Sequence, residues 1–312
     1  MSQFVARVLD QLSLSAWLPS AALVGTSVFL VQVRSSGGSP TDALTKIGNF
    51  DLTSVVLLVL AVVIGTIITQ AFEFEAIRWL EGYWGTFLPL CWAASLGCRW
   101  HTWRRNRHDL RRRRLRERAL SRTRSKITGH FGALAFAALE ARVLGTAPPP
   151  DVRQDDIELA ETIPWREDSS PHLVRQIDDL TVKLRGWPLA DHRVLPTRLG
   201  NILRAHEDRA VAGSSENVEG FVLRRFASLP PALQHEHDQY RTRLDLYCSM
   251  VLVSLICGAA GLALLWSYGW THRLAVAACA FGACLLSRRG AISAASGYGV
   301  VLESIAAGIA DG

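Results

Sequence analysis

The residues best suited to contact a ligand lie in one short stretch, LPTRLGNILRAHEDR, from Leu195 to Arg209. Thr197 is a favourable N-cap and apolar residues follow it at helical spacing, so we expect a helix that begins near Arg198. A glycine near the start of a helix is unfavourable unless another backbone or a bound group lies against it. An anion at this helix start, or a buried polar cluster, would involve Arg198, Gly200, Asn201, Glu207 and Asp208. The alternative is a helix that only packs on its neighbours, with Arg198 in an ion pair.

A second candidate surface is the arginine-rich stretch from Arg99 to Lys126, where nearly half of the residues are basic. Only Asp109 and Glu117 oppose them, so the net charge of +6 is concentrated in one local field. Beside a membrane, such a helix favours contact with anionic lipid headgroups. An acidic protein partner is a second alternative, and nucleic acid a third that lacks interleaved aromatic residues. The residues assigned to lipid contact are Arg104, Arg105, Arg111, Arg112, Arg113, Arg114, Arg116 and Arg118.

Metal and cofactor chemistry is weakly indicated. The closest approach to a metal site is His235-Glu236-His237-Asp238, whose two histidines would point apart on a helix. We therefore expect neither a metal site nor a cofactor. The six cysteines lie in apolar segments and none lies between Trp100 and Asp245, which suits a soluble region in a reducing compartment.

Long uncharged runs indicate the elements that position these residues. Residues 17–33, 52–72, 246–266 and 274–287 are apolar, and all but the short last run match a hydrocarbon core about 30 Å thick. The last run ends at Arg288-Arg289. We therefore predict an all-α protein with four transmembrane helices in two pairs, 14–72 and 246–288.

Basic residues near membrane ends are retained on the cytoplasmic side, which sets the orientation. The arginine-rich stretch and Arg288-Arg289 place both termini inside, so we predict a multi-pass protein of the bacterial inner membrane. Residues 1–13 form an expected amphipathic interfacial helix. Residues 73–100 are rich in tryptophan, and the apolar part at 85–98 is interpreted as interfacial or re-entrant, because it is too short to span.

The residues between the two pairs, 101–245, are predicted to form a mainly helical cytosolic domain, and residues 289–312 a cytosolic tail. Within the domain, residues 131–144 have the composition of a core helix. A second helix is expected at 172–184, with Leu173, Ile177, Leu180 and Leu184 on its apolar face and Asp178 and Asp179 in solvent.

Small residues four apart in the second pair favour close helix packing, either within the hairpin or between subunits. They are Ser254 with Gly258 and Ala278 with Gly282. A homo-oligomer is the expected assembly.

The chain also resembles a group of uncharacterised multi-pass membrane proteins of actinobacteria. The resemblance is carried by Arg198-Leu199-Gly200-Asn201, by Leu80-Glu81-Gly82-Tyr83-Trp84 after the second apolar run, and by a hydrophobic hairpin near the C-terminus. It implies a multi-pass membrane fold and brings no activity with it.

The residue types favour a non-enzymatic membrane protein, an oligomeric sensor or scaffold whose cytosolic domain binds a partner or ligand at the inner leaflet. A gated pore or membrane-perturbing effector is the first alternative. The second is a membrane-associated enzyme, which would need a cleft near Arg198, Asn201, Glu207 and Asp208.

Overall fold

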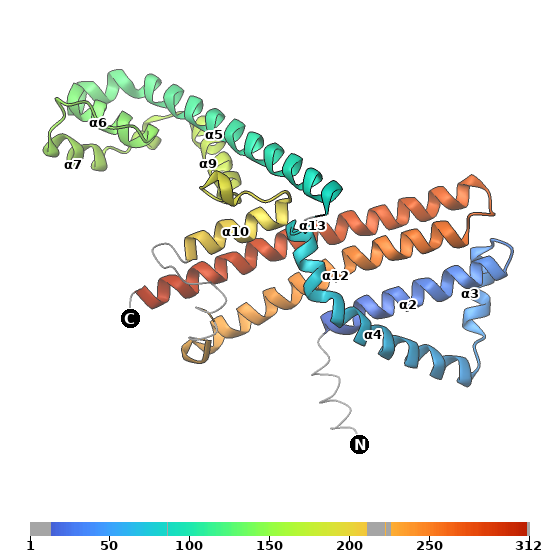
Figure 1. Cartoon of the computed structure of the whole chain (residues 1–312). Helices are drawn as coiled ribbons and strands as arrows, with labels where there is room; N and C mark the ends of the chain where they lie inside the picture. The colour runs from blue at the N-terminus through green and yellow to red at the C-terminus, as the bar shows by residue number, and fades with distance from the viewer. Residues whose placement is uncertain (1–13, 86, 211–221, 223–225, 311–312) are drawn as a thin grey trace. The chain divides into compact units, whose positions relative to one another are not determined.

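A computed structural model of the chain is all-helical, with 85% of it in helices and no strand in the part that it describes (Figure 1). The described residues are 14–85, 87–210, 222 and 226–310. The amphipathic helix predicted at 1–13 lies outside them. The chain forms two compact units: Met1–Ser95 with Leu195–Gly312, and Leu96–Val194.

The first unit is built from long apolar helices that lie side by side in Figure 1. Its elements are α2 (Leu14–Ser35), α3 (Pro40–Gly48), α4 (Leu52–Glu81), α10 (Arg198–Ala210), α12 (Pro231–Leu264) and α13 (Trp270–Ala310). Helix α2 packs on α4 and α12, α12 packs on α13, and α10 packs on α13 and α4. Two elements widely separated in sequence, α4 and α10, are thereby brought together.

Three of these helices, α4, α12 and α13, are long and apolar enough to cross a membrane. Helix α4 presents most of its apolar side chains outward: Val56 is 58% exposed, Leu60 52% and Ile67 64%. An apolar surface of this extent is unfavourable in water. The helix is compatible with hydrocarbon as its surroundings.

Helix α2 makes polar contacts with its neighbouring elements near both of its ends. The Ser20 and Thr66 hydroxyl oxygens lie 2.7 Å apart in a buried hydrogen bond between α2 and α4. At the other end of α2, the Tyr268 hydroxyl donates to the Arg34 carbonyl oxygen over 2.6 Å. These contacts attach α2 both to α4 and to the turn between α12 and α13.

Helices α12 and α13 form an antiparallel hairpin in which glycines allow close approach (Figure 1). A Cβ added at Gly258 would lie 2.7 Å from the Ala280 Cβ, so even alanine would force the helices apart. The close pairs, from the turn inward, are Gly261 with Val276, Gly258 with Ala280, Gly290 with Tyr247 and Gly297 with Tyr240.

The predicted packing residues occupy two different faces. Ser254 is buried and Gly258 lies in the hairpin interface. Ala278 is exposed, and a Cβ added at Gly282 would meet nothing within 4 Å. Within the described chain, this second pair faces away from α12.

Several predicted boundaries are absent because the helices continue through them. Helix α4 runs on to Glu81, α12 already begins at Pro231, and α13 extends from Trp270 through Arg288-Arg289 to Ala310. Each added residue of a helix gains one backbone hydrogen bond, and no proline interrupts these extensions. Residues 289–310 of the predicted tail are therefore a continuation of α13, in which Ala291, Ala294 and Ala295 are buried.

The second unit contains shorter helices after one very long one. They are α5 (Leu88–Phe131), whose first residues belong to the first unit, then α6 (Ala133–Leu144), α7 (Gln154–Thr162), α8 (Trp165–Asp168), α9 (Pro171–Arg185) and the 3-10 turn η1 (Asp191–Arg193). Pro89 lies in the first turn of α5, where its missing N–H is tolerated. Residues 88–100 and the arginine-rich stretch thus form one helix, without the predicted boundary at residue 100.

Two predictions for this unit are confirmed. Helix α6 is a core helix whose Phe136 and Leu139 are 3% and 1% exposed. Helix α9 buries Leu173, Ile177 and Leu180 against Leu115 and Ala119 of α5, whereas Leu184, also predicted on this face, is only half-buried. Asp178 and Asp179 lie outside this core, in ion pairs with Arg166 and Lys183.

Candidate functional site

The predicted ligand-binding residues of α10 lie where α10 meets the end of α4. The Thr197 hydroxyl accepts from the Gly200 N–H (3.1 Å) and donates to the Glu81 carbonyl oxygen (2.8 Å), so it caps α10 and ties it to α4. A Cβ at Gly200 would overlap the Glu81 carbonyl oxygen. Of the two alternatives for Gly200, a close backbone or a bound group, the structure shows a close backbone.

Asn201 is completely buried, and its amide group binds the chain itself. Its Oδ1 accepts from the Leu195 N–H (2.9 Å), and its Nδ2 donates to the carbonyl oxygens of Leu195 and Thr197 (both 2.7 Å). These bonds hold the turn that precedes α10. A buried amide with three internal partners has little capacity left for a ligand.

Gly82 ends α4 with φ +105°, a left-handed conformation that glycine adopts without strain, and it packs against Pro196. The two motifs Leu80-Glu81-Gly82-Tyr83-Trp84 and Arg198-Leu199-Gly200-Asn201 therefore contact each other. The Tyr83 ring extends this contact, because Arg204 donates to its hydroxyl and stacks 5.7 Å from the ring centroid.

The remaining charged residues of α10 also take part in contacts within the first unit. Arg198, Glu207 and Asp208 are half-buried and each has an interaction partner, which for Glu207 includes Arg204 at 3.7 Å. His206 Nδ1 lies 2.7 Å from a Glu303 carboxylate oxygen, and Arg209 also pairs with Glu303. Burial lowers the pKa of His206 and outweighs the opposing effect of the Glu303 hydrogen bond. This junction is a packed polar joint.

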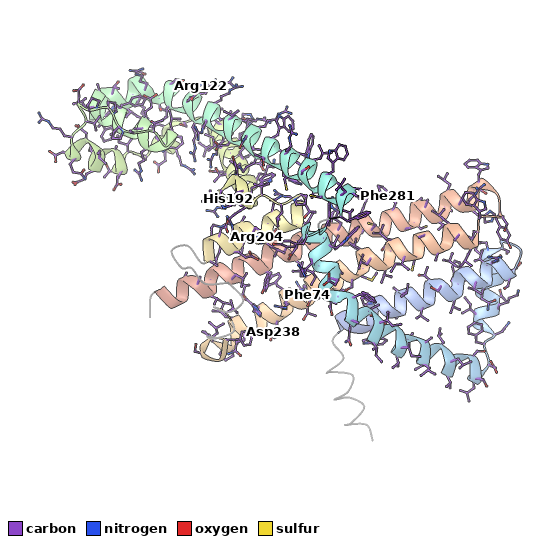
Figure 2. The ribbon with its side chains drawn as sticks, in the orientation of Figure 1. Phe74, Arg122, His192, Arg204, Asp238 and Phe281 are labelled. Atoms are coloured by element: carbon purple, nitrogen blue, oxygen red, sulfur yellow. The ribbon has the colours of Figure 1, made fainter. Side chains whose placement is uncertain are left out.

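The arginines of α5 divide into two groups. Arg105, Arg112 and Arg116 are half-buried and bind within the second unit. Arg105 donates to the carbonyl oxygens of Pro188 (2.9 Å) and Leu189 (3.1 Å), and Arg112 to Asp109 (2.7 Å). The exposed ones are Arg99, Arg104, Arg107, Arg111, Arg113, Arg114, Arg118, Arg122 and Arg124, of which Figure 2 labels Arg122.

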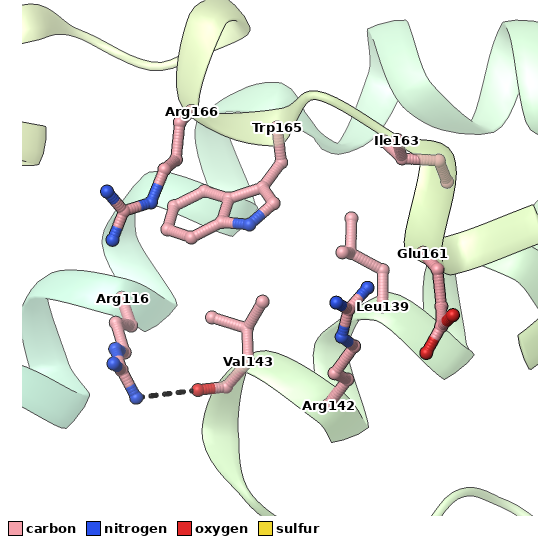
Figure 3. A pocket seen from close by; sticks show the side chains of 8 residues that line it. All are labelled: Arg116, Leu139, Arg142, Val143, Glu161, Ile163, Trp165 and Arg166. Carbon is pink, nitrogen blue, oxygen red and sulfur yellow. Dashed lines mark hydrogen bonds between the residues drawn. The ribbon is translucent and has the colours of Figure 1, made fainter. Parts of the chain in front are cut away.

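A pocket in the second unit brings three arginines together around one indole ring (Figure 3). Its volume is about 370 Å³. Helix α5 contributes Arg116, α6 contributes Leu139, Arg142 and Val143, and the segment from α7 to α8 contributes Glu161, Ile163, Trp165 and Arg166. In Figure 3, Arg116 and Arg166 lie on one side of the Trp165 ring, and Arg142 and Glu161 on the other.

Each pocket arginine is held by the chain at one point. Arg116 Nη1 donates to the Val143 carbonyl oxygen over 2.9 Å, and Arg142 Nη1 to the Ala160 carbonyl oxygen over 3.3 Å. Arg166 pairs with Asp178 at 3.0 Å and stacks 5.6 Å from the Trp165 ring centroid. These contacts fix the guanidinium groups while leaving donors available, since each carries five N–H groups.

The electrostatics of the pocket favour an anion. Burial, followed by the nearby guanidinium groups of Arg112 and Arg166, lowers the pKa of Arg116. The buried Nε of Arg116 has no hydrogen-bond partner among the described residues. An anionic group in the pocket would reduce the repulsion between these guanidinium groups. The apolar floor of Leu139, Val143 and Trp165 suits a flat or apolar portion of the same ligand.

Of the residues that line this pocket, the sequence analysis singled out only Arg116, and it predicted a lipid contact for that residue. Arg142 was the available signal, because it interrupts an otherwise apolar core helix. Trp165 and Arg166 come from a four-residue helix that gives no periodic pattern. These residues come together only because α7 and α8 fold back on α6, which is a property of the tertiary structure.

Among the described residues, no group of three or more His, Cys, Asp or Glu side chains is placed to hold a metal ion. His235 is exposed whereas His237 is buried against Tyr298, whose hydroxyl lies 3.2 Å from its Nε2. The two histidines thus point apart, as their spacing predicts.

No family model, no curated protein and no solved structure matches this chain.

Proposed function

We propose that the protein is a multi-pass membrane sensor that binds an anionic ligand in its arginine-rich helical domain on the cytosolic side. Four spans, α2, α4, α12 and α13, anchor it in the inner membrane with both termini inside. The observation that carries the proposal is the pocket of Arg116, Arg142, Arg166 and Trp165.

Helix length supports four spans. At 1.5 Å per residue, the stretches 14–33, 52–72, 245–264 and 270–288 are each about 27 to 30 Å long, close to the thickness of a hydrocarbon core. Helix α2 carries one charged side chain, Arg34 in its last turn. Because α13 begins at Trp270, the fourth span is longer than its apolar run, and Arg273 lies 5.1 Å from the Trp266 ring centroid at its outer end.

The positions of charge and tryptophan support the orientation. Trp266 and Trp270, 70% and 68% exposed, would lie at the outer headgroups, and Trp79 and Trp92 at the inner ones. Arg288-Arg289 and the exposed arginines of α5 would lie on the inner side, where anionic lipids attract them.

The exposed pair Ala278 and Gly282 supports a homo-oligomer. Small residues four apart on a lipid-facing helix surface allow a second helix to pack closely. The enzyme alternative gains no support at α10, where the side chain of Asn201 and the space beside Gly200 are used in packing.

Binding of inorganic pyrophosphate to the full-length protein in detergent tests the proposal. Calorimetric titration is expected to give saturable binding. Arg142→Gln is expected to weaken it about tenfold, because one charge-assisted hydrogen bond contributes roughly 1.5 kcal/mol. The matched control is Arg118→Gln, which removes an exposed arginine of α5 that lies outside the pocket.

Two outcomes contradict the proposal. One is the lack of saturable binding up to about 10 mM, where the free energy of binding is too small to signal specificity. The other is an equal loss in Arg142→Gln and Arg118→Gln, which would mean that pyrophosphate responds only to total positive charge.

A further inference from the structure

The outer side of α5 carries tryptophans and arginines in one continuous stripe on the second unit. They recur every three or four residues, and at about 100° per residue this spacing places them within about 100° of one another around the helix. All of them are exposed. We call this set the outer stripe, and its members are Leu96, Trp100, Trp103, Arg107, Arg111 and Arg114.

The opposite side of α5 is used by the second unit itself. Leu115 and Ala119 pack against α9, and Arg105 binds the segment that follows α9. Asp109 is the only acidic residue between positions 96 and 114. It is half-buried and pairs with Arg112 at 2.7 Å. The outer stripe is therefore cationic and apolar, and no carboxylate belongs to it.

The aromatic and cationic side chains of the stripe lie in contact. The ring centroids of Trp100 and Trp103 are 5.1 Å apart, and the Arg107 guanidinium lies 5.4 Å from the Trp103 ring centroid. The two tryptophans are 57% and 49% exposed. Two large aromatic side chains exposed side by side indicate an interaction surface, and the arginines around them indicate an anionic partner.

The composition of the stripe fits the headgroup region of a bilayer. Indole rings favour that depth because they are apolar with one polar N–H, and arginines there meet lipid phosphates. Leu96 and the neighbouring Leu110 are exposed as well. Aliphatic side chains gain from the acyl boundary of a bilayer, whereas a nucleic-acid backbone offers them no apolar partner.

The position of the stripe in the chain points to the same partner. Helix α4, which is long and apolar enough to cross a membrane, ends at Glu81, and α5 begins at Leu88. From Leu88 to the start of the stripe at Leu96 is about 12 Å of helix. A surface tethered this close to a bilayer meets it at a high effective concentration, so a moderate affinity is sufficient for docking.

We propose that the outer stripe docks the second unit on the inner leaflet, with Trp100 and Trp103 at headgroup depth and the three arginines of the stripe on anionic lipid phosphates. Docking then depends on the charge of the leaflet. The inference rests on the proposed membrane placement of α4, and it does not depend on anion binding in the arginine pocket.

Hydroxyl-radical footprinting of the full-length protein tests the proposal, with one protein molecule in each lipid nanodisc. The discs contain phosphatidylcholine alone or an equal mixture with phosphatidylglycerol, and mass spectrometry gives the oxidation rate of each residue. Trp100 and Trp103 are expected to lose most of their oxidation in the mixed discs. They should regain it in about 1 M NaCl, which shortens the screening length to about 3 Å. His172, exposed on α9, is the internal reference and should be oxidised equally in both discs.

Two substitutions separate the contribution of charge from that of the indole rings. Arg111→Gln is expected to lower the ratio of docked to undocked protein about fivefold, the factor that one arginine near an anionic surface contributes. Its matched control is Arg175→Gln, which removes an exposed arginine of α9 and should leave the ratio unchanged. Trp103→Ser is expected to raise the oxidation of Trp100 in the mixed discs, although every arginine remains.

Three results would overturn the proposal. The first is equal oxidation of Trp100 and Trp103 in the two kinds of disc. The second is an equal loss of protection in Arg111→Gln and Arg175→Gln, which would mean that the second unit responds only to total charge. The third is protection by single-stranded RNA added to phosphatidylcholine discs, with none from phosphatidylglycerol, which would assign the stripe to nucleic acid.

The same measurement distinguishes this proposal from the membrane placement on which it rests. Protein that does not enter nanodiscs would overturn both. Protein that enters them, and whose Trp100 and Trp103 stay fully oxidised, would overturn the docking alone.

Discussion

Replacing Gly200 by alanine tests whether the joint between α4 and α10 is as tight as the structure indicates. The added Cβ would overlap the Glu81 carbonyl oxygen and lie 3.0 Å from the Glu81 carbonyl carbon. Both atoms are backbone at the end of a helix, so α10 must move away from α4. Overpacking of this kind costs about 1 to 3 kcal/mol, and loss of the Thr197 bond to Glu81 about 1 kcal/mol more. The better helix propensity of alanine returns about 1 kcal/mol.

The net destabilisation is therefore expected to be about 1 to 3 kcal/mol, which lowers the unfolding temperature by roughly 2 to 5 °C for a chain of this size. Thermal unfolding in detergent, followed by tryptophan fluorescence, measures it at one fixed scan rate. Gly25→Ala is the control: it makes the same change in α2, a helix of the same unit, with open space beside it. A Gly200→Ala protein that unfolds at or above the wild-type temperature would refute the close approach of Glu81.

Two further predictions concern single side chains. Arg105→Ala is expected to destabilise the protein by about 1 to 3 kcal/mol, because it leaves the Pro188 and Leu189 carbonyl oxygens unpaired. Arg104 is the exposed neighbour of Arg105. Arg104→Ala should leave the unfolding temperature unchanged and weaken binding to anionic vesicles. Equal unfolding temperatures for both variants would contradict this division. Burial lowers the pKa of His206 below 6.5, so under acidic conditions the unfolded chain binds more protons than the folded one. The contribution of His206 to the free energy of unfolding should therefore be fully present above about pH 6.5 and decrease as the pH drops below it. The fall should be shallower in His206→Gln, and parallel pH profiles of the unfolding temperature would contradict the assignment.

Local signals were sufficient for α10. The cap at Thr197 and the buried face of Leu199, Ile202 and Leu203 follow from residue types and spacing, and the structure confirms them. For Gly200, the residue type left a close backbone and a bound group as alternatives, and the structure shows the backbone. The identity of that backbone did not follow, because Glu81 is more than a hundred positions away along the chain. A local sequence pattern can indicate that a glycine lies in a close contact, but it does not identify the residue on the other side of that contact.

The lengths of the long helices were underestimated for a related reason. Hydropathy reports where the surroundings of a helix change from apolar to polar, whereas the helix itself ends only where capping or a helix breaker stops it. Arg288-Arg289 marks such a change in polarity and lies in the middle of α13. The apolar contacts of the continuing helix with α10, such as Ala295 with Leu203, lie beyond that point.

The distribution of polar partners separates residues that build the fold from those free to bind a ligand. The segment with the strongest sequence signal, Arg198 to Asp208, has its amide and backbone groups paired within the first unit, so opening it to a ligand would first require breaking those bonds. In the second unit, Arg116, Arg142 and Arg166 lie around one pocket whose lining contains a single carboxylate, that of Glu161. The guanidinium groups around this pocket repel one another, and an anion that binds between them would stabilise the folded state by its binding free energy. Under the proposed function, binding of an anion at this pocket would thereby be coupled to the stability of the domain.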